Sequence, residues 1–230
     1  MSFFRTFAPA LALGALTLTA TPASADAITL DGGDVGQIYT FTFNGFSDGS
    51  IISGLSALGT FTLQAVTGNS YRFGYSVTNT TSDPVNSRMS GFAFNTDPNI
   101  TSASSTGAFS FNTVGGSYPN GVGSVDVCFK DASTGSCAGG GNGGLTDGQT
   151  GTGTFTLNFA QPLTSLTLSD FFNRYQSITG AGNVSSATGS GTLTGTSGGT
   201  SVPEPGMLGL FGAALVGVGL MRRRQRFTAA

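Results

Sequence analysis

The stretch Thr60-Phe-Thr-Leu-Gln-Ala65, followed by Tyr71-Arg-Phe-Gly-Tyr-Ser-Val77, alternates apolar and polar residues with a period of two. Such alternation is typical of β-strands that turn one face to a core and the other to water. Gly68-Asn69, between the two segments, supplies residues that favour tight turns. We therefore predict two half-buried antiparallel strands joined by a hairpin.

The same alternation recurs on both sides of this stretch. It is present at Tyr39/Phe41/Phe43, Phe92/Phe94, Phe109/Phe111, Val125/Val127/Phe129, Phe155/Leu157/Phe159 and Leu166/Leu168. Turn residues separate the repeats at Asn44-Gly45, Asp48-Gly49, Asp83-Pro84, Asp97-Pro98 and Pro119-Asn120-Gly121. No segment between the N-terminal leader and residue 206 shows a helical apolar stripe. The pattern predicts an all-β fold with an antiparallel β-sandwich or jelly-roll-like body.

Composition and charge narrow the functional classes. The 230 residues suit one domain, and 19 phenylalanines supply a core although only 9% of residues are charged. Four of the nine cations lie in the last nine positions and Arg5 lies in the N-terminal leader. The body keeps four, against eleven acids in the chain: Arg72, Arg88, Lys130 and Arg174. An acidic body with scattered cations offers no stripe for phosphates, so we expect no nucleic-acid binding.

The N-terminus has the three parts of a secretory signal peptide. Arg5 precedes a short apolar run, and Ala23-Ser24-Ala25 forms a small-residue cleavage site. We predict a signal peptide over residues 1–25 and a mature chain that starts at Asp26 outside the cytoplasm. An uncleaved N-terminal anchor is the alternative.

The C-terminus combines a stiff motif, an apolar segment and a cationic end. Val202-Pro203-Glu204-Pro205 precedes sixteen apolar residues, 206–221, and the segment ends with Arg222, Arg223, Arg224 and Arg226. As a helix the apolar segment is about 24 Å long, short for a hydrocarbon core of about 30 Å. We predict a single transmembrane helix with its arginines as a cytoplasmic stop-transfer signal.

Residues 202–230 resemble the PEP-CTERM sorting signal of Gram-negative bacteria. The resemblance rests on Pro203-Glu204-Pro205, the short apolar helix and the terminal arginines, in that order. It implies recognition by an exosortase, a membrane-embedded cysteine transpeptidase of bacteria that make an exopolysaccharide matrix, with the tail as substrate. A plain membrane anchor is the alternative interpretation.

Two segments separate the leader from the tail. Residues 26–179 are expected to form the β-body. Residues 180–201 consist largely of glycine, serine and threonine, and this composition is typical of a flexible linker. A final strand around residues 188–194 is the alternative for that segment.

The two cysteines, Cys128 and Cys137, have eight residues between them. Because an exported pair is expected to oxidise, we predict a disulfide worth roughly 2.7 kcal/mol on the chain-entropy model. A metal or redox pair is the alternative. The two-cysteine loop, its glycine run and Phe171–Ser177 resemble the cistern-family subset of PEP-CTERM proteins, a resemblance that implies no known chemistry.

The chain contains few residues that could act as catalytic groups. Histidine is absent, and the only glutamate is Glu204 in the tail, so neither a Ser-His-Asp triad nor a histidine metal site can form. We expect no enzyme activity and no cofactor. Calcium is the one ligand left open, because aspartates in turns of exported β-proteins can coordinate it. The candidates are Asp31, Asp34, Asp48 and Asp147.

These observations predict an exported, non-catalytic protein of the cell surface or extracellular matrix. Its sorting would begin as a periplasm-facing intermediate in the inner membrane. One alternative is an exopolysaccharide-binding module in which Tyr39, Tyr118 or Tyr175 stacks on sugars, although each of these rings is expected to be buried. The other is a permanently anchored β-protein whose tail is never cleaved.

Overall fold

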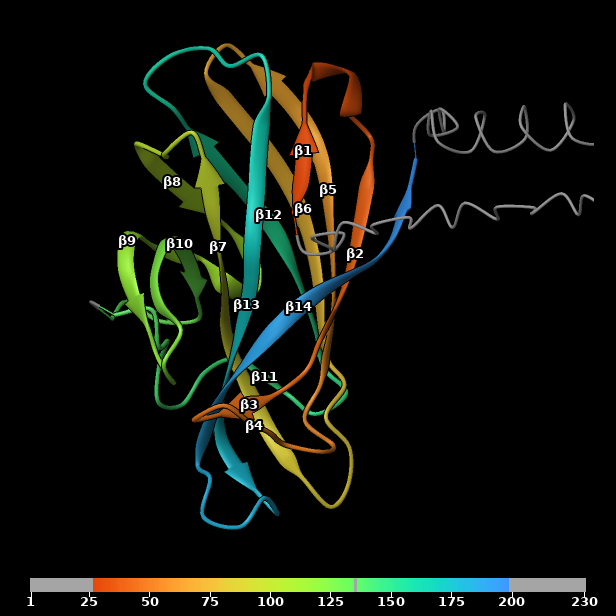
Figure 1. The fold of residues 1–230 in the computed structure, drawn as a ribbon, viewed down its shortest axis with the longest axis vertical. Coiled ribbons are helices and arrows are strands. Elements are labelled where there is room, and N and C mark those ends of the chain that lie inside the picture. The colour runs from red at the N-terminus through yellow and green to blue at the C-terminus, as the bar shows by residue number, and fades with distance from the viewer. Residues whose placement is uncertain (1–26, 135, 199–230) are drawn as a thin grey trace, which may run out of the picture.

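The computed structural model describes residues 27–134 and 136–198, and this part of the chain consists of β-strands and two short 3-10 helices (Figure 1). The all-β prediction is confirmed. The strands are β1 Ile28–Leu30, β2 Ile38–Phe43, β3 Phe46–Ser47, β4 Ser50–Ile51, β5 Ala57–Thr67, β6 Ser70–Asn79, β7 Asn86–Asp97, β8 Ser102–Ser105, β9 Phe111–Tyr118, β10 Gly123–Lys130, β11 Leu145–Thr146, β12 Thr150–Asn158, β13 Leu166–Thr179 and β14 Ser186–Ser197. The helices are η1 Gly32–Asp34 and η2 Gly107–Phe109.

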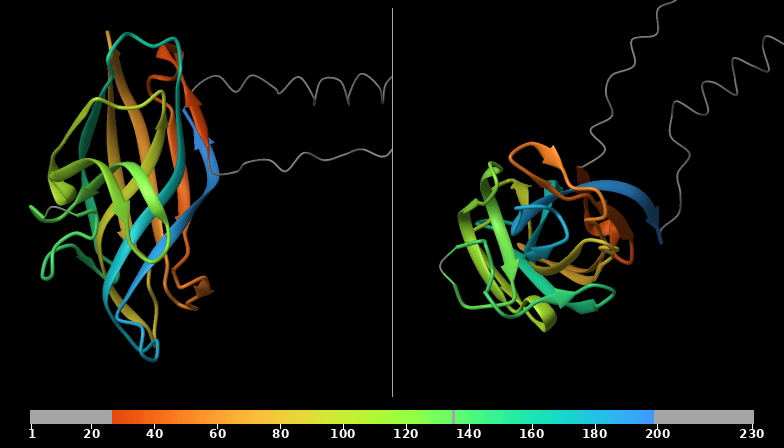
Figure 2. Two further views of the ribbon diagram at one scale, coloured as in Figure 1. Left: turned by 60° about the vertical axis from the view of Figure 1, so that its left-hand side comes forward. Right: turned by 90° about the horizontal axis from the view of Figure 1, so that it is seen from below.

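The strands form one antiparallel path that folds back on itself. Its order is β8-β12-β6-β5-β2-β14-β13-β7-β10-β9, and the shorter strands β1, β3, β4 and β11 attach beside it. Seen from below, the path nearly encloses the core, as a sandwich with one open side (Figure 2). The open side lies between the two end strands, β8 and β9, which η2 connects.

The hairpin predicted at residues 60–77 is present as β5 and β6. Thr67 pairs with Ser70, so Gly68 and Asn69 form a two-residue turn. Gly68 has a φ of +59°, a left-handed conformation that glycine adopts without steric cost. Tyr71, Phe73 and Val77 are fully buried on the inner face, as the alternation predicted.

Phenylalanine rings from the two layers meet in the core. Phe61 and Phe155 come from the layer of β5 and β12, and Phe92 and Phe129 come from the layer of β7 and β10. Ring centroids are 5.4 Å apart for Phe61–Phe92 and 4.7 Å apart for Phe129–Phe155. Distances of this size are favourable for aromatic pairs, so these contacts hold the layers together.

A buried ring also closes the open side of the sandwich. Phe109, from η2, is fully buried and lies 5.6 Å from Phe92 between ring centroids. Its backbone N–H donates to the Tyr75 hydroxyl, which in turn donates to the Thr106 carbonyl. The connection between the end strands is therefore anchored to the core at both its ring and its backbone.

The segment predicted as a flexible linker is a central strand of the sheet. β14 pairs with β13 through residues 186–190 and with β2 through residues 191–197, so it passes from one layer to the other. The linker prediction for residues 180–201 is thus wrong over this strand, and its alternative, a strand around residues 188–194, is right but too short. The body extends to Gly198.

Close packing explains the glycines of β14. A Cβ atom at Gly189 would collide with the Asn173 side chain and the Asn44 carbonyl, and one at Gly191 would lie 2.7 Å from the Phe43 ring. Glycine is therefore needed here for close backbone approach rather than for flexibility. Composition alone cannot separate these two uses of glycine.

The two terminal predictions lie outside the described residues. They concern the signal peptide, with Ala23, Ala25 and Asp26, and the apolar helix of residues 206–221. Within residues 27–134 and 136–198, no helix has the length and apolar character that crossing a membrane requires.

Two glycine substitutions test whether β14 is a packed strand. Gly189→Ala should lower the free energy of unfolding by about 1–3 kcal/mol, because the new methyl group meets backbone and a buried amide. Gly195→Ala is the matched control, since a Cβ atom there meets nothing within 4 Å. Urea unfolding of the mature protein measures both. Equal midpoints for the two variants would contradict the assignment.

Candidate functional site

The predicted disulfide is present and lies on the outer face of the β7–β10 layer. Cys128 of β10 and Cys137 are bonded, with 5.7 Å between their Cα atoms, and both are buried. They pack with Ala93, Tyr118 and Val125 in a second, smaller apolar cluster. Gly116 of β9 leaves room for the Cys137 sulfur, which a Cβ atom there would approach to 2.8 Å. The bridge closes a loop over this face.

Lys130 lies under the same loop and is 1% exposed. Its Nζ donates to Thr113 Oγ1 at 2.7 Å, to the Ser136 carbonyl at 2.8 Å and to the Thr134 carbonyl. Burial lowers the pKa of Lys130 below its ordinary value. Among the described residues no carboxylate pairs with Lys130, because Arg88–Asp131 is the one ion pair they form. The ammonium is satisfied by neutral oxygens of the disulfide loop and β9.

Arg88 fixes the glycine run that follows the disulfide. Its guanidinium contacts Asp131 Oδ2 at 3.1 Å and donates to the Gly140 carbonyl at 2.8 Å. Asp131 Oδ1 accepts from the Gly140 N–H at 2.7 Å. A Cβ atom at Gly144 would collide with the Met89 carbonyl. The glycine run is therefore packed against β7.

Arg174 is the third buried cation. Its Nη1 donates to the Ala187 carbonyl at 2.9 Å and to the Asn120 side chain, and burial lowers its pKa. Of the four cations in the body, only Arg72 is exposed. The sequence shows four scattered cations but not that three of them are buried. No local pattern shows this, because the covering contacts come from other segments, such as Gly140 for Arg88, Ser136 for Lys130 and Ala187 for Arg174.

The four calcium candidates do not converge. Asp31 and Asp34 lie together but cap η1, where Gly33 N–H donates to Asp31 at 2.6 Å and Asp31 N–H donates to Asp34 at 2.8 Å. Asp48 occupies the β3–β4 turn with a φ of +49°. Asp147 accepts from the Ser87 N–H at 3.1 Å. Over the described residues, no group of three or more His, Cys, Asp or Glu side chains is placed to hold a metal ion.

The tyrosines proposed to stack on sugars are buried. Tyr39, Tyr118 and Tyr175 are each at most 6% exposed. A ring enclosed in this way presents no face to a polysaccharide, so the structure contradicts this part of the sugar-binding hypothesis.

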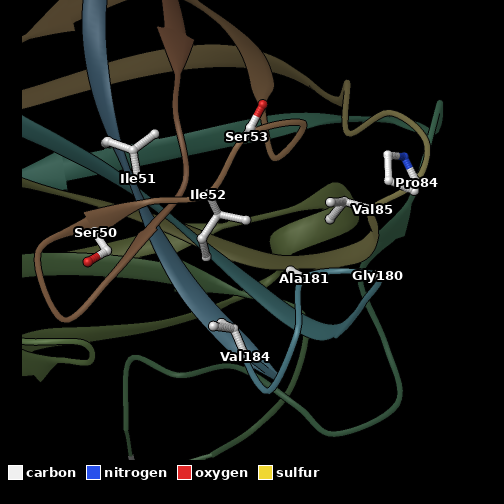
Figure 3. A pocket seen from close by; sticks show the side chains of 9 residues that line it. All are labelled: Ser50, Ile51, Ile52, Ser53, Pro84, Val85, Gly180, Ala181 and Val184. Atoms are coloured by element: carbon white, nitrogen blue, oxygen red, sulfur yellow. The ribbon is translucent and has the colours of Figure 1, made fainter.

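An apolar groove lies at one end of the body, beside the β3–β4 hairpin (Figure 3). Its volume is about 520 Å³. Three segments line it, with Ser50, Ile51, Ile52 and Ser53 from the first, Pro84 and Val85 from the second, and Gly180, Ala181 and Val184 from the third. Its lining contains two hydroxyls and no titratable side chain, so it offers no acid, base or nucleophile beyond those two serines.

Comparison with known protein families identifies a sorting motif near the C-terminus of the chain. The family model of the PEP-CTERM protein-sorting motif matches residues 201–225. The chain carries a PEP-CTERM sorting motif. No curated protein and no solved structure matches the chain.

The match covers most of the residues predicted to act in sorting. Val202, Pro203, Glu204 and Pro205 fall inside it, as do Arg222, Arg223 and Arg224, while Arg226 follows directly after it. All of them lie outside the described residues. The motif supports exosortase-dependent sorting and implies export through the cell envelope to the surface. It describes the tail alone, so the cistern-family assignment stays a prediction.

Substituting the buried lysine tests the loop that it holds. Lys130→Met should lower the free energy of unfolding of the protein by about 1–3 kcal/mol, because the oxygens of Thr113, Thr134 and Ser136 lose their donor. Arg72→Met removes an exposed cation and should change little. Urea unfolding compares the two variants. A neutral Lys130→Met would show that the loop does not depend on this ammonium.

The buried tyrosines predict alkaline unfolding. Burial, with Asp34 and Asp31 nearby, raises the pKa of Tyr39 to about 12, and burial also raises the pKa values of Tyr71, Tyr75, Tyr118 and Tyr175. The unfolded chain releases these protons from about pH 10, before the folded protein does, so stability falls as pH rises above that value. Lys130 and Arg174, with their lowered pKa values, act in the opposite direction but are two groups against five.

Phenolate absorbance and circular dichroism, followed together from neutral to alkaline pH, test this expectation. Both signals should change in one transition above about pH 10, because the phenols ionise as the protein unfolds. Ionisation of all five tyrosines at their ordinary pKa, with the fold intact, would contradict it.

Proposed function

We propose that this protein is a non-catalytic structural component of the bacterial cell surface or extracellular matrix, and that an exosortase sorts and processes it through its tail. The observation that carries the proposal is the sorting motif at residues 201–225, directly after a rigid β-body. The described residues of the body include no recognisable set of catalytic side chains. Joined to a sorting signal, such a body suits a structural role at the cell surface rather than catalysis.

The spacing between the body and the motif supports this role. β14 ends at Ser197 and the match begins at residue 201, so only residues 198–200 intervene. Three residues reach at most about 11 Å when fully extended. Because residues 191–197 of β14 pair with β2, the body can lengthen this connection only by breaking those pairs. The body would therefore stay close to the membrane surface while the exosortase acts.

The chemistry of the side chains supports a non-catalytic body. The chain has no histidine, and its single glutamate is Glu204 in the motif. Several aspartates already have structural partners. Asp131 holds Arg88, Asp147 accepts from Ser87, and Asp126 accepts from the Thr96 N–H at 2.8 Å.

The proposed route follows from the two ends. The leader would be removed after Ala25, leaving Asp26 at the new terminus. Residues 206–221 would then hold a periplasm-facing intermediate in the inner membrane of a Gram-negative bacterium, with Arg222–Arg226 on the cytoplasmic side. Processing by the exosortase would move the body to the surface or the matrix.

A structural role is preferred over exopolysaccharide binding. The sugar-binding hypothesis relied on Tyr39, Tyr118 and Tyr175, which are buried, and the groove of Figure 3 has aliphatic walls. Sugar sites usually use exposed aromatic platforms, and the tyrosines proposed for that task are part of the core.

Mass spectrometry of the mature protein tests the proposal. In cells with an exosortase the protein should lose Arg222–Arg226, and in cells without one it should keep them. Pro203→Ala combined with Pro205→Ala should also leave the tail uncut, because the stiff motif is lost. Pro162→Ala, in an exposed loop of the body, is the matched control and should be processed normally. An uncut tail on the wild-type protein in exosortase-containing cells would favour a permanent anchor.

A further inference from the structure

Three asparagines of the chain are each followed directly by glycine, in the pairs Asn44-Gly45, Asn120-Gly121 and Asn142-Gly143. Asparagine in such a pair is chemically labile, because the backbone nitrogen of the next residue can attack the carbon of the side-chain amide. Glycine makes the attack easiest, since it has no Cβ atom to shield its nitrogen and its backbone turns freely. From sequence alone the three pairs are equivalent, so the fold decides which of them reacts.

Asn120, in the turn between β9 and β10, is held by hydrogen bonds at both ends of its amide. Its Oδ1 accepts from the Arg174 guanidinium and from Thr188 Oγ1, the latter at 3.4 Å. Its Nδ2 donates to Ser47 Oγ at 3.2 Å and to the Ser186 carbonyl at 3.4 Å. The side chain must leave these partners before its amide carbon can reach the next backbone nitrogen, so the fold protects it.

Asn44, directly after β2, is held as well. Its Oδ1 accepts from the Ser190 N–H at 2.9 Å, and its own N–H donates to the Ser190 carbonyl at 3.2 Å. The next residue, Gly45, is buried, and a Cβ atom there would collide with the Leu55 side chain. Hydrogen bonding on one side and close packing on the other restrict the rotation that the attack requires.

Asn142 lies in the glycine run that follows the disulfide, and both it and Gly143 are exposed. Within the described part of the chain, no hydrogen-bond partner holds the Asn142 amide. The hydrogen bonds that fix this run are made two residues earlier, at Gly140. The Asn142 side chain can therefore turn toward the Gly143 nitrogen without breaking a contact with the body.

Packing explains why a labile pair occurs at this position. A Cβ atom at Gly143 would lie 2.7 Å from Asp131 Oδ2, the oxygen that contacts Arg88 at 3.1 Å. A larger residue would push this carboxylate away from its ion pair, so the contact favours glycine at 143. The same glycine leaves Asn142 without a neighbouring side chain to shield the nitrogen that attacks it.

We propose that Asn142 is a site of spontaneous deamidation in the folded protein, and that the reaction loosens the glycine run. The Gly143 nitrogen forms a bond to the amide carbon of Asn142. The bond from that carbon to the amide nitrogen breaks, and the nitrogen leaves as ammonia with the proton that Gly143 loses. Water then opens the succinimide ring at either carbonyl, with its hydroxyl going to that carbon and its hydrogen to the ring nitrogen. The products are aspartate and isoaspartate at this position.

Both products change a segment that is fixed on either side. Gly140 is bonded to Arg88 and Asp131, and a Cβ atom at Gly144 would collide with the Met89 carbonyl. Isoaspartate adds a methylene to the backbone between these two points, so one of the contacts must shift. The new carboxylate also stands near that of Asp131, and like charges repel. The inference concerns the body alone and does not depend on sorting of the tail.

Tandem mass spectrometry of the full-length protein, incubated in detergent at mildly alkaline pH, tests the site. In the folded protein Asn142 should lose its amide at least roughly ten-fold faster than Asn44 and Asn120, because their hydrogen bonds must break first. In guanidinium chloride the three should react at similar rates. Asn183 is the matched exposed control, since the branched side chain of Val184 shields the next nitrogen, and it should stay intact. Equal rates for the three glycine pairs in the folded protein, or an intact Asn142, would overturn the proposal.

Asn142→Gln tests the effect on the glycine run, because the longer side chain must close a larger and less favourable ring. After incubation the wild type should unfold at a lower urea concentration than its fresh sample, whereas Asn142→Gln should keep its midpoint. Asn183→Gln is the matched variant and should lose stability as the wild type does. An unchanged midpoint in deamidated wild type, or an equal loss in Asn142→Gln, would show that the glycine run is not loosened by this reaction.

Discussion

The structure depends on one strand that belongs to both layers. β14 pairs with β13 over its first five residues and with β2 over the rest, so its backbone hydrogen bonds connect the two halves of the sheet. Its glycines allow this crossing, because Gly189 and Gly191 leave no room for a side chain against Asn173 and Phe43. On the inner side of this crossing, the ring of Phe171 lies 4.1 Å from that of Phe41 and 5.5 Å from that of Phe61.

A disulfide and buried cations stabilise the loop on the outer face of the β7–β10 layer. One disulfide closes this loop. Lys130 donates to neutral oxygens such as the Ser136 carbonyl, and Arg88 forms an ion pair with a single carboxylate, that of Asp131. Buried cations are costly unless each donor is satisfied, and the loop carbonyls supply that satisfaction. Disulfide and loop carbonyls therefore act on the same segment, and together they shape the edge strand β9 that borders it.

The same crossing strand connects the fold to the function. Because β14 includes residues whose composition resembles a flexible linker, only residues 198–200 separate the end of β14 at Ser197 from the start of the matched sorting motif at residue 201. β14 ends beside β2, on the side of the body away from β9 (Figure 2).

The sequence by itself determined the all-β class, the hairpin of β5 and β6, the disulfide and the sorting motif. Each of these depends on local alternation, turn residues, a single cysteine pair or a short contiguous signal. Tertiary structure alone decided that residues 186–197 form a strand and that Lys130, Arg88 and Arg174 are buried. The reason is that a glycine or a cation takes its role from distant segments that pack against it, and no local pattern records those contacts.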